Sequence, residues 1–108
     1  MFKSYHHFLQ SAKMGNVKAF NLVGLCQLYG KGVDKDQFKA IRMFEKGIYL
    51  RSGEAINNLG LCYDQGRGVP KDHNLAYVYY QQAAQLGNKT AKKNIKIMKK
   101  IKKDFLKK

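Results

Sequence analysis

An internal repeat of 36 residues constrains this chain more than any other feature of its sequence. When the sequence is shifted by 36 positions, Gly24-Leu25-Cys26 falls on Gly60-Leu61-Cys62. In the same register, Gly30-Lys31-Gly32-Val33 falls on Gly66-Arg67-Gly68-Val69. The register continues beyond both full units, which predicts half a unit before residue 19 and half a unit after residue 90.

Each full unit has the pattern of two helices, which we term helix A and helix B. In helix A of the second unit, apolar residues recur at the three- and four-residue steps of a helix, at Ala55, Ile56, Leu59, Cys62 and Tyr63. Gly66 and Gly68 predict the end of this helix, because glycine adopts the left-handed conformation without strain, and Pro70 cannot extend it. Side chains suited to cap helix N-termini stand before each predicted helix, at Asn16, Asp36, Ser52, Asp72 and Asn88.

These signals predict an all-α chain, an α/α solenoid of two full 36-residue helix pairs with a half unit at each end. We expect helices at about 2–14, within 17–50, within 54–86 and at about 89–107. A single domain, 1–108, would comprise a half unit (1–18), two repeats (19–54 and 55–90) and a basic closing helix (91–108).

Small and aromatic residues at equivalent positions predict how the helices pack. Close approach of helix A and helix B is expected at the pairs Gly24/Gly60 and Ala40/Ala76. The aromatic residues Phe8, Phe44 and Tyr80 are expected to fill the space between successive pairs. In the closing helix, Lys96 replaces the equivalent glycine, and the expected apolar stripe comprises Ala91, Ile95, Met98, Ile101 and Phe105.

The pattern resembles the Sel-one-like repeat family, whose members are α/α solenoids related to the tetratricopeptide repeats. The matching residues of the second unit are Ala55, Asn58, Leu59, Gly60, Tyr63, Gly66, Arg67, Gly68, Val69, Asp72, Ala76, Tyr80, Ala83, Ala84 and Gly87. The first unit matches less closely, with Leu22, Gln27 and Gly47 where the motif has Asn, Tyr and Ala. The resemblance implies a scaffold in which helix A of each unit lines the concave face.

Residues of the A helices that do not pack on helix B would then face a ligand. The candidate partner-binding residues are Lys18, Asn21, Asn57, Leu61, Asp64, Lys93 and Lys100, with Leu25, Leu28, Gln65 and Ile97 beside them. Amide side chains can pair with a peptide backbone, and lysine favours a carboxylate. The partner expected on this face is a protein, or an extended or acidic peptide, and the alternative is a merely solvated face.

The basic charge is concentrated at one end of the chain. The 21 Lys and Arg against 7 Asp and Glu give a net charge of +14, of which residues 91–108 supply +8. This helix could be a solvated cap, a contact to RNA phosphates or an amphipathic helix at an anionic membrane. The candidate phosphate or anion contacts are Lys92, Lys96, Lys99, Lys102 and Lys103, together with Lys93 and Lys100. With only three Arg in the chain, sequence-specific reading of bases is not expected.

Several classes of function are disfavoured by the sequence. There is no apolar run of the roughly 20 residues that a transmembrane helix needs. Cys26 and Cys62 are expected to be buried thiols, because equivalent helices lie about 8–10 Å apart and a disulfide needs Cα atoms within about 7 Å. Each Gly-x-Gly loop follows a helix rather than a strand, which favours helix termination over phosphate binding. No metal-ligand spacing, catalytic set or cofactor motif is present, so we expect neither an enzyme nor a bound cofactor.

The sequence thus favours a non-enzymatic interaction scaffold or adaptor. The alternative is a small basic structural subunit of a ribonucleoprotein assembly, such as a ribosome, which would use the closing helix on RNA. A cytoplasmic location is expected, and the mitochondrial matrix is the alternative, because residues 1–33 contain no acidic side chain.

Overall fold

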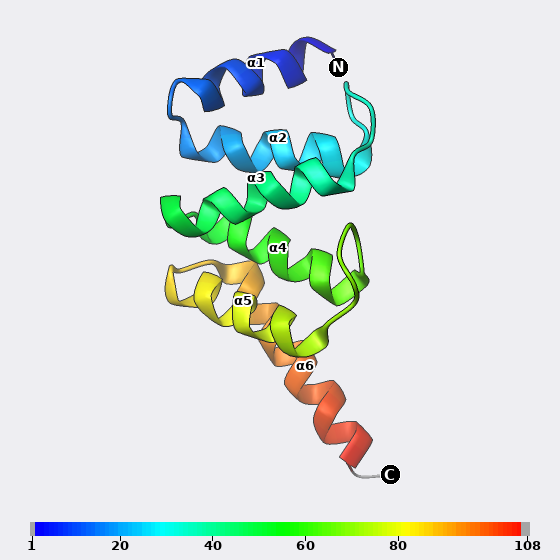
Figure 1. Cartoon of the computed structure of the whole chain (residues 1–108). Helices are drawn as coiled ribbons and strands as arrows, with labels where there is room; N and C mark the ends of the chain where they lie inside the picture. Colours follow the sequence, from blue (N-terminus) through cyan, green and yellow to red (C-terminus); the bar gives the residue numbers. More distant parts are fainter. Residues whose placement is uncertain (1, 107–108) are drawn as a thin grey trace.

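The computed structural model describes residues 2–106 and the side chains of residues 5–103. Every regular element in this range is a helix, which confirms the predicted all-α fold (Figure 1). The helices are α1 (Phe2–Lys13), α2 (Val17–Tyr29), α3 (Gln37–Leu50), α4 (Gly53–Gln65), α5 (His73–Gln85) and α6 (Lys89–Leu106). Their ends agree with the predicted ones to within one residue, and residue 107 lies outside the described range.

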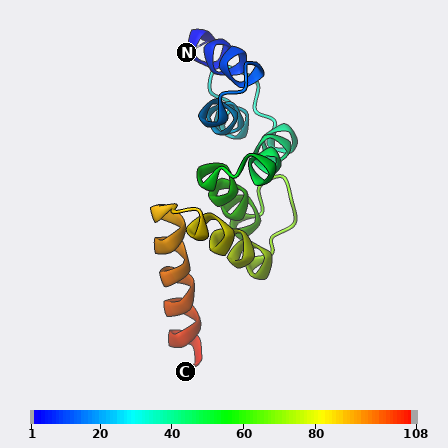
Figure 2. The same cartoon turned by 90° about the vertical axis from the view of Figure 1, so that its left-hand side faces the viewer.

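The helices form an extended stack in chain order. Each helix packs against the next one along the chain, and α2 also contacts α4 directly. The stack measures 50 × 26 × 19 Å, with the two ends of the chain at its opposite ends (Figure 1). Figure 2 shows that α6 leaves the stack and runs away from it. The arrangement is the predicted solenoid, with α2, α4 and α6 as A helices and α1, α3 and α5 as B helices.

Short-range hydrogen bonds fix where these helices begin and end. The side chains of Asn16, Asp36, Ser52, Asp72 and Asn88 each accept a hydrogen bond from the backbone N–H three residues further on. Gly30 and Gly66 adopt left-handed conformations at the ends of α2 and α4, with φ of 73° and 68°. The predicted N-caps and glycine stops are therefore confirmed.

The paired helices approach each other most closely where an aromatic ring covers a glycine. Phe44 and Tyr80 are 0 % and 1 % exposed. A Cβ atom on Gly24 would lie 2.5 Å from Phe44 Cε1, and one on Gly60 would lie 2.8 Å from Tyr80 Cδ1. These contacts leave no room for a larger residue, which confirms the predicted close approach of helices A and B.

Asparagine side chains join successive A helices at equivalent positions. Asn58 Nδ2 donates to Asn21 Oδ1 between α4 and α2, and Asn94 Nδ2 donates to Asn57 Oδ1 at 3.1 Å between α6 and α4. The accepting residues, Asn21 and Asn57, are each 5 % exposed. Because a buried amide that loses its partner is costly, these bonds set the register of the A helices against one another.

The closing helix α6 packs on the stack only in part. Ala91 is fully buried, and Ile95 and Met98 are half-buried against the cluster that includes Tyr80. Ile101, however, is 63 % exposed, which corrects the expectation that the apolar stripe is covered as far as this residue. The physical reason is divergence, because α6 runs away from the stack and leaves Ile101 uncovered (Figure 2). The side chain of Phe105, the last residue of the expected stripe, lies outside the described side chains.

Replacing Gly24 by alanine tests the close approach of α2 and α3. We expect Gly24→Ala to lower the free energy of unfolding by about 1–2 kcal/mol, because the cost of overpacking exceeds the gain of roughly 1 kcal/mol in helix propensity. Urea unfolding followed by circular dichroism measures the change. Phe44→Leu makes room for the new methyl group. In the double variant, the loss of unfolding free energy should therefore be smaller than the sum of the losses in the two single variants. Strict additivity would contradict the proposed contact.

The hydrogen bonds between asparagine side chains are tested by removing one acceptor. We expect Asn57→Ala to destabilise the protein by about 1–2 kcal/mol, because Asn94 Nδ2 loses its partner at a half-buried site. Asn74→Ala is the matched control, since Asn74 is exposed and should tolerate the change to within about 0.5 kcal/mol. Equal melting curves for the two variants would show that the buried amide does not hold α4 and α6 together.

Candidate partner-binding surface

The predicted partner-binding residues fall into three classes of exposure. Lys18, Lys93 and Lys100 are exposed, as are the neighbouring Gln65 and Ile97. Leu61 and Asp64 are half-buried, as is Leu25. Asn21, Asn57 and Leu28 are buried. The A helices therefore present a basic surface at the α6 end, and their contribution to binding stays a prediction.

The burial of Asn21 and Asn57 corrects the expectation that both amides face a ligand. Each lies beneath the next A helix and accepts a hydrogen bond from it. The sequence did contain a signal for this pairing, because the donors Asn58 and Asn94 are themselves 36 residues apart. Lys93 stands at the equivalent position of α6 and is exposed, so the three residues do not form one continuous exposed row.

The lysines of α6 are available to an anionic partner. Lys92, Lys93, Lys96, Lys99, Lys100, Lys102 and Lys103 are all exposed. Among the described side chains, the one ion pair joins His73 and Asp64, so none of these lysines is neutralised by a described carboxylate. A contact of these lysines with phosphate, lipid or protein stays a prediction.

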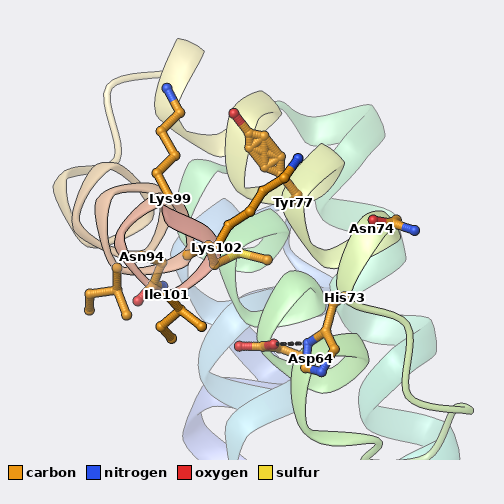
Figure 3. A pocket seen from close by; sticks show the side chains of 10 residues that line it. Asp64, His73, Asn74, Tyr77, Asn94, Lys99, Ile101 and Lys102 are labelled. Carbon is orange, nitrogen blue, oxygen red and sulfur yellow. Dashed lines mark hydrogen bonds and ion pairs between the residues drawn. The ribbon is translucent and has the colours of Figure 1, made fainter. Parts of the chain in front are cut away.

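Sequence reasoning missed a hollow of about 610 Å³ between α5 and α6. It is lined by Asp64, His73, Asn74, Tyr77, Asn94, Ile97, Met98, Lys99, Ile101 and Lys102, and we term it the α5–α6 hollow. Figure 3 shows His73 and Asn74 on one side and Ile101 with Lys102 on the other, with Asp64 between them. No periodicity marks such a site, because it depends on how far α6 diverges from α5.

Asp64 is the centre of a small polar network at this hollow. Its Oδ1 lies 2.7 Å from His73 Nδ1, and its Oδ2 accepts a hydrogen bond of 3.3 Å from the Tyr80 hydroxyl. Burial raises the pKa of Tyr80, and the Asp64 carboxylate raises it further, so this phenol keeps its proton and donates. The network holds the Asp64 carboxylate in a fixed position at the end of α4.

The arrangement does not assemble the groups of a hydrolytic or metal site within the described residues. The lining of the hollow contains no serine, threonine or cysteine. Cys26 and Cys62 are free and buried as predicted, and burial raises the pKa of Cys62 to about 11, so its thiolate is scarce at neutral pH. No cluster of three His, Cys, Asp or Glu side chains in the described range could hold a metal ion. None of the described helices is long and apolar enough to cross a membrane.

Solved structures with the same fold are known from several bacteria. A Sel1 repeat protein from Oxalobacter formigenes is 32 % identical, with a TM-score of 0.73 over 82 % of this chain and 67 % of that one. Cysteine rich protein B of Helicobacter pylori is 25 % identical, with the same TM-score and the same coverage of both chains. The protective antigen c5321 of uropathogenic Escherichia coli, at 23 % identity, shares the fold with a TM-score of 0.75, and this chain spans 20 % of its length.

A family assignment follows from the sequence match as well as from the fold. No curated protein matches the chain. The model of the Sel1 repeat family, by contrast, matches residues 2–16, 18–51 and 53–88, which cover most of α1 to α5. These segments confirm the resemblance drawn from the repeat motif. The chain belongs to the Sel1 repeat family, whose members are generally non-catalytic scaffolds for protein–protein interaction.

Proposed function

We propose that this protein is a non-enzymatic scaffold that binds a protein partner through the exposed surface of α2, α4 and α6. The observation that carries this proposal is the direct contact of α2 with α4, which α3 and α5 do not match in the described part of the chain. Helices on the inside of a curved stack lie closer together than those on the outside. The contact of α2 with α4 therefore supports the proposal that the A helices line the concave face.

The charges of this surface favour an acidic partner. Lys18 lies in the first turn of α2, and Lys93 and Lys100 are exposed on α6. Asp64, the acidic residue of the set, is already paired with His73 and Tyr80. A peptide rich in carboxylates would meet uncompensated lysines at the α2 and α6 ends of this surface, which favours its encounter and orientation.

Charge reversal on α6 tests the scaffold function. We expect Lys93→Glu with Lys100→Glu to reduce the amount of partner that co-purifies with the tagged protein by about tenfold, because attraction becomes repulsion at two exposed positions. The measurement is quantitative mass spectrometry of the captured proteins, at one physiological salt concentration.

A double variant with the same change in charge serves as the control. Lys35→Glu with Lys39→Glu alters exposed residues before and at the start of α3, a B helix outside the proposed surface, and should leave capture unchanged. Equal loss in both variants would assign the effect to net charge. Unchanged capture in the α6 variant would reject the proposed face.

The seven exposed lysines of α6 favour one further candidate function, that of a small basic subunit in a ribonucleoprotein assembly. Such a helix would neutralise phosphates without reading bases, so binding would be independent of sequence and sensitive to salt.

Salt titration separates this candidate from the scaffold function. If α6 binds RNA, the affinity for a single-stranded polyuridine probe should fall steeply with salt, and the slope should decrease by about 1.4 in Lys99→Gln with Lys103→Gln, since each lysine contributes about 0.7. Fluorescence anisotropy from low to physiological salt provides both values. Absence of binding at low salt, or an affinity that does not change with salt, would exclude this role for α6.

A further inference from the structure

The α5–α6 hollow occupies a place that the preceding junction of the solenoid fills with apolar side chains. By the 36-residue register, Asp64, Tyr77 and Met98 correspond to Leu28, Ile41 and Cys62. Those three equivalents are 3 %, 7 % and 0 % exposed and belong to one buried cluster. Residues at equivalent repeat positions therefore form a core between α2, α3 and α4, but an open hollow between α4, α5 and α6.

Two departures from the repeat keep the hollow open. Asp64 replaces the core leucine and is held by His73 and Tyr80 rather than by apolar contacts. Lys99 stands at the position of Tyr63, whose ring stacks on Tyr79 with centroids 5.6 Å apart. A helix that only closed the solenoid would gain stability from apolar residues at these positions, so the two substitutions favour an open hollow over a packed junction.

The lining of the hollow combines an apolar surface with two lysines and with the Asp64 carboxylate, which is held by His73 and Tyr80. Ile97 and Ile101 are 55 % and 63 % exposed, which is unusual for large apolar side chains beside a cavity. Lys99 and Lys102 line the hollow from the same helix, and Lys99 extends from the side of α6 opposite to Ile101 (Figure 3). His73 and Asn74 offer hydrogen-bonding groups from the α5 side (Figure 3). Such a lining suits a peptide segment in which an apolar residue stands next to Asp or Glu.

Charge decides which occupant fits. A second copy of the chain that brought its own N-terminal end or its own α6 to this surface would meet like charge. Residues 1–18 carry +3 without an acidic side chain, and residues 91–108 carry +8, so both ends would be repelled. A partner rich in Asp and Glu is attracted by the same field and can desolvate Ile97 and Ile101 on binding.

We propose that the α5–α6 hollow is the anchor site for an acidic segment of a protein partner. An apolar side chain of this segment packs on Ile97 and Ile101, and its neighbouring carboxylates pair with Lys99 and Lys102. The inference rests on the proposed scaffold function, and it adds the position of the anchor and the chemistry of the segment that it takes.

A synthetic peptide provides a direct probe of this site. The probe is a fluorescein-labelled peptide of about 12 residues, roughly 18 Å long as a helix, with leucines on one face and glutamates beside them. We expect it to bind the full chain in fluorescence anisotropy. Two control peptides have Gln for each Glu and Ser for each Leu, respectively. Each should bind about tenfold more weakly, because the first lacks the carboxylates and the second lacks the apolar side chains.

Variants of exposed residues locate the contact. Ile97→Ser and Lys102→Gln should each weaken binding of the acidic peptide by about tenfold, without loss of fold because both side chains are on the surface. Lys39→Gln is the matched control on α3 and should leave binding unchanged. Circular dichroism confirms that all three variants remain helical.

The outcomes distinguish this inference from the proposed function. Failure of the wild-type chain to bind the acidic peptide, or equal binding of the Gln peptide, would overturn the anchor site while partner capture could still support the scaffold. Sensitivity to Lys93→Glu but not to Lys102→Gln would move the contact to the A-helix surface. Concentration-dependent dimerisation that Ile97→Ser abolishes would instead assign the hollow to a second copy. Stronger binding of polyuridine or phosphatidylserine vesicles, lost in Ile97→Ser, would equally overturn a protein occupant.

Discussion

The contact between an aromatic ring on helix B and a glycine on helix A underlies the rest of this structure. Phe44 on Gly24 and Tyr80 on Gly60 bring the paired helices to a distance that any Cβ atom would prevent. Because both rings are fully buried, they fix the spacing of each helix pair. The remaining faces of the pair are then left to contact the next pair. The pairing of α2 with α3 and of α4 with α5 follows from this local constraint, which occurs once in each unit.

A polar interaction complements this packing along the A helices. The bonds from Asn58 to Asn21 and from Asn94 to Asn57 link three helices at one register. Apolar contacts alone would allow neighbouring pairs to slide, whereas a buried amide requires its partner in one position. The binding surface is thereby held on a fixed frame, which is what a scaffold needs to present side chains from several helices to one partner.

The end of the solenoid is where structure and proposed function meet. Lys96 replaces the glycine on which a further aromatic ring would pack, so α6 does not offer the surface on which α4 receives α5. Its lysines and exposed isoleucines are instead directed to solvent and to the α5–α6 hollow. The net charge of +14 is thus mainly a property of this one helix rather than of the repeats.

The repeat, the six helices and their ends could be predicted from local sequence, because caps, glycine stops and apolar periodicity act between residues a few positions apart. The sequence also placed the buried thiols and the close contacts of Gly24 and Gly60. The burial of Asn57 and the exposure of Ile101 became visible only in the folded chain. Both depend on where α6 lies relative to α4 and α5, and so does the hollow beside Asp64. Such long-range geometry follows from the packing of whole helices, and no single segment of sequence encodes it.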